Sequence, residues 1–491
     1  MMRPLVSVEG ARRVDARTRE EYGVPELVLM EQAGMRLHEV FREVAGEDGP
    51  VVYVCGSGNN GGDAMVMARW AWLEGRRDVR LVLRARRFSE AGRVQARVLE
   101  RLGVPVLVWE EEREEVRRVC REAGWVVEGV LGVGARGGLA EDVAELFRVV
   151  GESGARVFSV DVPGGVGCEG GVRADVTAMV GVGKWEVLVP AWREWAGELR
   201  VVPIGFPPEV VREEAEGWWL GPGDVGGLVG RVRAASHKGE RGRVGVWAGS
   251  RGLAGAALLS ARAAARTPAG LVYLCCDEEV YGLLGGLGGG VVVRPGDEGV
   301  RVDAAVVGPG WGRGEGRVGQ LAAILGRCGR GVIDADGLEA LARLRDGEGR
   351  LDLGGRWVLT PHPGECARLA GCTVEEVLGA PGRVCGELAR GLGAVVVLKA
   401  HTTWVVAPSG RVWVYDGMCA PLGTGGAGDV LAGVIGGLLA HGVGVEEAAC
   451  AGVVAHGEAG RRLFARRGWF GAEDLVGEVG TILKDLGVDY G

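Results

Sequence analysis

The sequence lacks the features that would place the chain in a membrane or outside the cell. No uninterrupted apolar run reaches the roughly 18 residues of a membrane-spanning helix, and the N-terminus has no apolar core of the length found in secretory signal peptides. The 11 cysteines are scattered without a CxxC pair, which favours buried reduced thiols over a disulfide framework or a zinc site. We therefore expect a cytoplasmic protein with no membrane partner.

An excess of positive charge is also absent. The formal net charge is -8, with 25% charged and 47% hydrophobic residues, an ordinary globular composition. A nucleic-acid partner would be favoured by a basic surface. We therefore expect no nucleic-acid partner, and any phosphate group of a substrate must be bound by local donors.

The chain of 491 residues is too long for one compact core, and we expect two domains. Proline, glycine and charged residues cluster after Pro208, which predicts a boundary near Glu216 and domains covering residues 1–216 and 217–491. In both parts, apolar strand patterns alternate with helical patterns. This alternation predicts α/β domains built on largely parallel sheets.

Glycine, in contrast, is abundant. The 91 glycines follow no G-X-Y period, so neither a collagen helix nor disorder fits. Their number weakens every motif that rests on glycine alone, because GxGxxG begins in at least five places, among them Gly56, Gly132, Gly165, Gly314 and Gly423. Only the elements around a glycine loop can identify a binding site.

The first of these loops follows an apolar stretch from Val51 and precedes a helical pattern that we expect to begin near Asp63. Strand, glycine loop and helix form the context of a nucleotide-binding fingerprint. Asn59, Asn60 and Asp63 add polar groups that a plain dinucleotide loop does not need. Either they satisfy the turn and cap the helix, or they form a polar substrate site that could include a cation.

Two more carboxylates, Glu128 and Asp161, end apolar strands later in this half. The carboxyl ends of parallel strands meet at one edge of a sheet, where ligands bind. We therefore expect Asn60, Asp63, Glu128 and Asp161 to share one site.

A second informative loop, Gly423–Gly428, precedes Asp429 and a small, apolar helical pattern. Glycine amides and the positive end of a helix suit a phosphate. A carboxylate would repel that phosphate, so Asp429 makes sense as a base that takes a proton from an attacking hydroxyl. The alternative is that Asp429 is an ordinary helix N-cap.

Two other polar pairs in the second half allow a metal interpretation. Asp334 and Asp336 could ligate a metal or form a turn and a cap, and we favour the turn. His362 and Glu365 suggest zinc, but there is no HExxH helix and no third clustered ligand, so we disfavour a zinc site.

The stretches GSGNNGGDAMVMAR, SVDVPGGVGCEGG and ADVTAMVGVGK resemble the N-terminal domain of the bifunctional NAD(P)H-hydrate repair enzymes, over roughly residues 27–208. That domain epimerises the damaged cofactor and binds potassium, so the resemblance implies a Rossmann-like three-layer αβα fold with Asp161 as acid/base. It implies substrate binding by Asn59, Asn60, Gly61, Gly62, Asp63, Gly132, Gly134 and Arg136, and potassium ligation by Asn60 and Glu128.

Two positions depart from this family pattern. The family usually has Asp where this chain has Glu128, and Ser where it has Gly164; both are potassium ligands there. Glu128 can still offer oxygen to a hard cation, but Gly164 has no side-chain oxygen. The sequence leaves open whether the potassium site survives.

The stretches TPHPGECARL, VVLKAHTT and GTGGAGDVLAG resemble the C-terminal domain of the same enzymes, a ribokinase-like, ADP- or ATP-dependent NAD(P)H-hydrate dehydratase, over roughly residues 236–439. The resemblance implies that Asp429 contacts the substrate hydroxyl. It implies a hydrate site with Ala256, Gly310, His362 and Glu365, and a nucleotide site with Lys399, Ala400, His401, Thr402, Thr403, Gly423, Thr424, Gly425, Gly426, Ala427 and Gly428. Ala400 and Pro268 stand where glycine is usual.

The implied substrates are NADH and NADPH hydrates, with ADP favoured over ATP and with Mg²⁺ and K⁺ as cofactors. Phosphorylation would turn the hydrate's hydroxyl into a good leaving group. Transfer of a phosphoryl group, as in a kinase, would then be followed by loss of phosphate, and the overall reaction would be a dehydration. The rival hypothesis is a ribokinase-like small-molecule kinase fused to a non-catalytic nucleotide-binding module; a dehydrogenase is disfavoured because NNGGD crowds its loop with polar groups. We expect a homo-oligomer, of a size that the sequence does not give.

Overall fold

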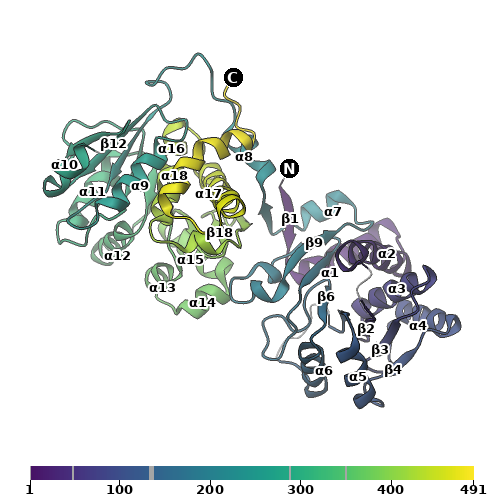
Figure 1. Cartoon of the computed structure of the whole chain (residues 1–491). Helices are drawn as coiled ribbons and strands as arrows, with labels where there is room; N and C mark the ends of the chain where they lie inside the picture. Colours follow the sequence, from purple (N-terminus) through teal and green to yellow (C-terminus); the bar gives the residue numbers. More distant parts are fainter. Residues whose placement is uncertain (1, 47–48, 132–137, 287–288, 349–350) are drawn as a thin grey trace. The chain divides into compact units, whose positions relative to one another are not determined.

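The computed structural model describes residues 2–46, 49–131, 138–286, 289–348 and 351–491. These residues form two compact units, one covering Pro4–Glu216 and the other covering Gly217–Gly491 together with the first residues of the chain (Figure 1). Each unit is built around one main sheet.

The first unit is built on a seven-stranded, fully parallel sheet in the order β4-β3-β2-β5-β6-β7-β9. The order reverses between β2 and β5, which opens a crevice at the carboxyl ends of these strands. The bounds are β2 Val51–Cys55, β3 Val79–Leu83, β4 Val106–Val108, β5 Trp125–Gly129, β6 Arg156–Val160, β7 Val176–Val180 and β9 Glu198–Val202. A short strand β8 (Gly183–Lys184) pairs in parallel with β1 (Arg3–Val6).

Both faces of this sheet are covered, as the side chains of β2 illustrate. Tyr53 packs in a core with Phe41, whereas its neighbours Val52 and Val54 pack in a second core with Phe147. Successive residues of a strand point to opposite faces, so one strand supplies both cores. The helices are α1 Val8–Tyr22, α2 Glu26–Ala45, α3 Asn59–Leu73, α4 Glu90–Leu102, α5 Arg113–Glu122, α6 Glu141–Glu152 and α7 Pro208–Glu213.

The second unit has its strands in the order β13-β12-β11-β14-β15-β16-β17-β18-β19-β10. All neighbours are parallel except β18, which is antiparallel to β17 and to β19. The bounds are β10 Gly217–Leu220, β11 Arg243–Trp247, β12 Leu271–Cys276, β13 Val292–Pro295, β14 Ala304–Val307, β15 Gly331–Ile333, β16 Trp357–Leu359, β17 Val395–Leu398, β18 Thr402–Val406 and β19 Val412–Asp416.

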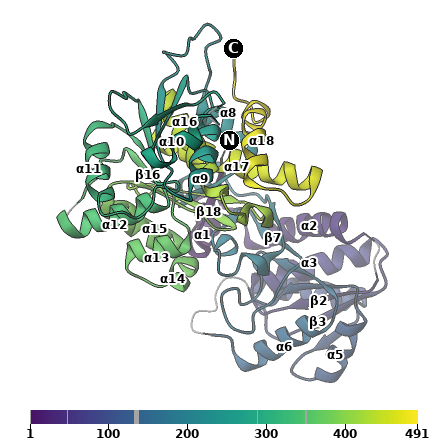
Figure 2. The same ribbon diagram turned by 60° about the vertical axis from the view of Figure 1, so that its left-hand side comes forward.

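Helix α16 (Ala427–His441) is the central helix of this unit, and twelve of its residues are buried. It packs closely on α9, where a Cβ added to Gly433 would lie 2.1 Å from the Ser260 carbonyl oxygen. Helices α13, α14 and α15 lie side by side in both views (Figures 1 and 2). The other bounds are α8 Val225–Val229, α9 Ala254–Ala264, α10 Glu278–Gly285, α11 Arg317–Arg327, α12 Asp336–Glu348, α13 Pro363–Ala370, α14 Val374–Gly379, α15 Pro381–Leu392, α17 Val445–Arg467 and α18 Ala472–Asp485.

The α/β class and the parallel sheets predicted from the sequence are confirmed. The predicted start of the helix after the first glycine loop was wrong: α3 begins at Asn59, so Asn59 and Asn60 lie in its first turn. The N-caps of α3 and α16 are Gly58 and Gly426, so Asp63 and Asp429 are not the caps that the alternatives proposed. In the described part of the chain, no helix combines the length and apolar character that crossing a bilayer requires.

The tight contact at Gly433 predicts a stability effect. Gly433→Ala should lower the free energy of unfolding by about 1–3 kcal/mol, because the added methyl group meets the backbone of α9 and overpacks the core. The matched control is Gly477→Ala inside α18, where no atom lies within 4 Å of the new methyl group. This control should be neutral or stabilising, since alanine is the better helix former. Urea unfolding of both variants measures the difference, and equal midpoints would contradict the packing argument.

Candidate active sites

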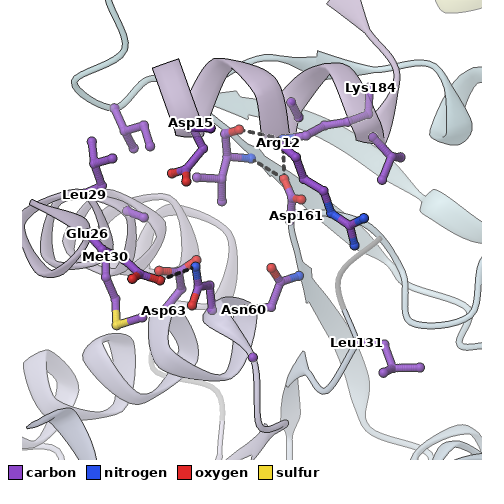
Figure 3. A pocket seen from close by; sticks show the side chains of 18 of the residues that line it. Arg12, Asp15, Glu26, Leu29, Met30, Asn60, Asp63, Leu131, Asp161 and Lys184 are labelled. Atoms are coloured by element: carbon purple, nitrogen blue, oxygen red, sulfur yellow. Dashed lines mark hydrogen bonds and ion pairs between the residues drawn. The ribbon is translucent and has the colours of Figure 1, made fainter. Parts of the chain in front are cut away.

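The first unit contains a cavity of about 670 Å³. It lies at the carboxyl ends of the strands, where β2 leads into α3 and where β6 ends, and helices α1 and α2 contribute further side chains (Figure 3). Its polar lining includes Arg12, Asp15, Glu26, Asn59, Asn60, Asp63, Asp161 and Lys184. Clefts with a few convergent polar groups are the usual form of small-molecule sites.

Asp161 follows β6 directly and adopts a left-handed backbone conformation with φ 71°. A non-glycine residue in this conformation is strained and is held there by its surroundings. Its Oδ1 accepts hydrogen bonds from the Val180 amide at 2.9 Å and from the ammonium group of Lys184. The Lys184 side chain is only 2% exposed and also donates to the Val180 carbonyl at 2.6 Å. The ion pair therefore fixes the Asp161 carboxylate at the cavity wall.

In the NNGGD segment (residues 59–63), the asparagines and the glycines have different roles. The Asn59 amide donates to Glu26 at 2.8 Å, and the Asn60 amide donates to the Val160 carbonyl at 3.0 Å. Gly61 and Gly62 are buried and allow close packing, because a Cβ on Gly61 would lie 2.1 Å from the Gly56 carbonyl oxygen and one on Gly62 would lie 2.3 Å from Met30. The two asparagines line the cavity, and the two glycines let α3 approach its neighbours.

Asp63 also lines the cavity and is 6% exposed. Burial raises the pKa of its carboxyl group well above the ordinary value, and the negative charges of Asp161 and Asp15 raise it further. The cavity therefore holds two carboxyl groups in different environments: Asp161 is paired with a lysine, and the buried Asp63 has a raised pKa. Such pairs are suited to acid/base chemistry.

Glu128, expected to share this site, does not line the cavity and is fully buried. Its carboxyl group accepts hydrogen bonds from the Val130 amide at 2.8 Å, the Gly164 amide at 3.0 Å and the Ser159 hydroxyl at 3.2 Å. Burial raises the pKa of Glu128 to about 7, although these hydrogen bonds oppose the shift. The predicted residues Gly132, Gly134 and Arg136 lie outside the described residues.

In the second unit, Asp429 lies in the first turn of α16. Burial raises the pKa of its carboxyl group to about 7; Asp334 adds to the shift, and Lys399 opposes it. Gly426 starts the helix with φ 91°, and in the described structure no side chain caps this helix N-terminus. The amides of the first turn therefore remain suited to an anion beside a carboxyl group that titrates near neutral pH.

Lys399 lies beside this loop, because a Cβ on Gly428 would lie 3.0 Å from its Nζ. The ammonium group donates to Asp334 Oδ1 at 2.6 Å, and the Thr360 hydroxyl donates to the same oxygen at 2.8 Å. Burial is the largest effect and lowers the pKa of Lys399, but the carboxyl groups of Asp334, Glu365 and Asp429 together outweigh it, so the pKa lies above its ordinary value. Asp334 is thus a partner of Lys399, whereas Asp336 begins α12 and accepts a hydrogen bond from the Gly312 amide at 2.8 Å.

The other predicted nucleotide-site residues lie in two turns. Ala400 and His401 connect β17 to β18, and Thr402 and Thr403 begin β18. The Thr403 hydroxyl donates to the Ala400 carbonyl at 3.3 Å. Gly423 ends a short 3₁₀ turn and Thr424 follows it, before the glycines that lead into α16.

The predicted hydrate-site residues fall into two groups. Gly310 has φ 55°, and a Cβ on it would lie 3.0 Å from the Ala256 side chain, so these two residues are neighbours. His362 and Glu365 form a capping box at the start of α13: the ring Nδ1 of His362 accepts from the Gly364 amide at 3.1 Å, and Glu365 accepts from the His362 amide at 2.9 Å. The Nε2 atom of His362 lies 3.5 Å from Glu365 Oε1, so both nitrogens of the ring face groups at the start of α13.

Sequence reasoning missed three residues of these sites. Lys184 and Asp15 were not singled out, although a lone lysine in the apolar run around Met179–Val189 is a signal of a buried charge with a partner. His456 on α17 was also missed. Its Nε2 donates to the Ala427 carbonyl at 2.9 Å, and burial lowers its pKa to about 4, so the neutral ring helps to hold the first turn of α16.

Comparisons with known proteins agree with this organisation. Residues 244–479 match the family described as NAD(P)H-hydrate dehydratase, and residues 26–184 match the family described as YjeF-related protein N-terminus. A ribokinase-like superfamily protein of Enterococcus faecalis is similar in structure, with a TM-score of 0.50 and 24% identity over 55% of this chain and 96% of that chain. This likeness concerns the fold alone, and the ribokinase-like fold predicted for the second half is confirmed.

Two relatives extend over nearly the whole chain. A bifunctional NAD(P)H-hydrate repair enzyme of Moorella thermoacetica is 30% identical over 519 residues, which cover 98% of this chain and 97% of that protein. Another, of Methanopyrus kandleri, is 34% identical over 508 residues, which cover 96% and 95%. The chain belongs to the family of bifunctional NAD(P)H-hydrate repair enzymes.

Proposed function

We propose that the chain repairs hydrated nicotinamide cofactors: the first unit interconverts the R and S epimers of NAD(P)H hydrate, and the second unit dehydrates the S epimer to NAD(P)H. The observation that carries the dehydratase assignment is the half-buried Asp429 carboxyl group, with its raised pKa, at the uncapped N-terminus of α16. A base and an anion site side by side are what phosphorylation of a hydroxyl requires.

In the proposed dehydratase reaction, Asp429 accepts the proton of the hydrate's hydroxyl while the oxygen attacks the β-phosphorus of ADP. The bond between that phosphorus and the bridging oxygen breaks, and AMP leaves with the electron pair. The carbon–oxygen bond then breaks, phosphate departs with its electron pair, and the adjacent ring carbon loses a proton, which restores the double bond. The amides of Gly425, Gly426 and Gly428 stabilise the charge on the transferred phosphoryl group.

The turns at Lys399–Thr403 and Gly423–Gly428 would hold the nucleotide, and ADP is proposed as donor from the family resemblance. The described residues contain no group of three His, Cys, Asp or Glu that could hold a metal. Mg²⁺ would therefore be bound chiefly through the nucleotide phosphates, where it neutralises their charge.

In the first unit, Asp161 acts as the acid/base at the hydrated ring carbon. Lys184 holds the Asp161 carboxylate in place. The substrate is also bound by three side chains of α3 that line the same cavity, those of Asn59, Asn60 and Asp63. With epimer exchange in one unit and dehydration in the other, both epimers reach the same product.

Replacing Asp429 tests the dehydratase. Asp429→Asn should slow nucleotide-dependent recovery of NADH from its hydrate by about 10²–10⁴-fold, because the amide cannot accept the proton. NADH absorbance measures the recovery with ADP or ATP as donor, and epimer exchange should persist as the internal control. Unchanged recovery would refute the role of Asp429, and a stable phosphorylated product in place of free phosphate would favour a small-molecule kinase.

The raised pKa of Asp429 predicts a pH dependence. A base works only when ionised, and the pKa of this carboxyl group lies at about 7. The dehydration rate at saturating substrates should therefore fall as the pH drops below about 7, tenfold for each pH unit. A rate that stays flat down to pH 5 would show that Asp429 is not the base.

Replacing Asp161 tests the epimerase. Asp161→Asn should slow conversion of R to S hydrate by about 10²–10⁴-fold, because the residue loses its acid/base function. The dehydration rate measured on the S epimer alone should not change, which makes it the matched control. Chiral separation of the hydrates during the reaction gives the exchange rate, and normal exchange in the variant would refute the assignment.

A further inference from the structure

The family resemblance implies a potassium site in the first unit, and the residues of this chain do not fit it. Of the three side chains in question, Asn60 is kept, Glu128 stands for a shorter Asp, and Gly164 stands for Ser. The described residues around Glu128 show what the two changes do together.

Hydrogen-bond donors of the protein already surround the Glu128 carboxyl group. The amides of Val130 and Gly164 and the hydroxyl of Ser159 all donate to it, at 2.8 to 3.2 Å. A carboxylate offers about four lone-pair directions, so three donors leave little for a cation. A cation would also have to lie against hydrogens that point toward the carboxylate.

The space for the missing serine is filled. A Cβ on Gly164 would lie 2.7 Å from Glu128 Oε1 and 2.4 Å from the ring of Phe147, which is itself buried. The Asn60 side-chain NH₂ group donates to the Val160 carbonyl, so of the three implied ligands only the Asn60 amide oxygen is left to face a cation. The longer acid and the glycine therefore fit each other and remove two of the three side-chain oxygen ligands that a hard cation would use there.

We propose that the first unit works without potassium, and that the Glu128 carboxyl group takes over the structural role of the ion. Glu128 lies in β5, Ser159 lies in β6, and Gly164 lies three residues after Asp161, so one carboxyl group joins two strands and the loop that follows Asp161. Glu128 is thus a positioning residue for Asp161. This inference rests on the proposed epimerase function.

The first test is the epimer exchange rate of the wild-type chain in KCl, NaCl and choline chloride at matched ionic strength. The expected result is the same rate in all three salts, since only non-specific screening remains. A rate that rises with KCl alone and saturates would overturn the proposal. Absence of exchange in every salt would instead refute the epimerase assignment.

The second test does not depend on activity. The thermal unfolding midpoint is measured in KCl and in choline chloride for the wild-type chain and for Glu128→Gln, because an ion bound only by the folded state raises the midpoint. Equal potassium responses of the two proteins, including none, support the proposal. A potassium-specific rise in the wild type that Glu128→Gln lacks would overturn it, whether or not the first unit is an epimerase.

A reversion gives the third test. The triple variant Glu128→Asp, Phe147→Leu, Gly164→Ser shortens the acid, makes room and restores the hydroxyl, with Phe147→Leu alone as the matched control. The triple variant should gain a potassium-specific rise of the unfolding midpoint that the control lacks. A folded triple variant with no gain would show that these positions do not decide potassium binding and would overturn the proposal.

Discussion

The burial of charge is the constraint on which both sites depend. An ionised side chain removed from water is costly unless it is paired and hydrogen-bonded. Each unit meets this demand in the same way, with a lysine bound to an aspartate just beyond the carboxyl end of a parallel strand: Lys184 with Asp161 after β6, and Lys399 with Asp334 after β15. In each unit a second carboxyl group lies near the pair without a lysine of its own, and its pKa is raised: Asp63 in one, Asp429 in the other.

The lysine-paired aspartates and the carboxyl groups with a raised pKa therefore differ in what they can do. The paired aspartates keep a fixed place, whereas burial raises the pKa of the other two carboxyl groups, to about 7 for Asp429. In the first unit we assign the chemistry to the paired acid, Asp161, and in the second to the unpaired one, Asp429. The difference follows from position, since Asp334 is fully enclosed by Lys399 and Thr360, whereas Asp161 faces a cavity.

The sequence was sufficient to predict the fold class, because alternating strands and helices leave few architectures. It also placed Asn60, Asp63 and Asp161 at one sheet edge, and these three do line one cavity. The lysine pairs could not be read from local patterns, because 23 residues separate Asp161 from Lys184 and 65 separate Asp334 from Lys399. The helix start at Asn59 was missed because two asparagines and two glycines favour a loop by propensity, whereas packing against Met30 and Gly56 decides the outcome.

The fit between Glu128 and Gly164 also bears on the history of this chain. A side chain at position 164 would meet the Phe147 ring at 2.4 Å and Glu128 Oε1 at 2.7 Å, so it requires both neighbours to shift. The residues at positions 128, 147 and 164 are therefore coupled, and a replacement at one of them changes what the other two tolerate. The same reasoning makes the identities at these three positions a joint character, by which members of the family could be sorted from sequence alone.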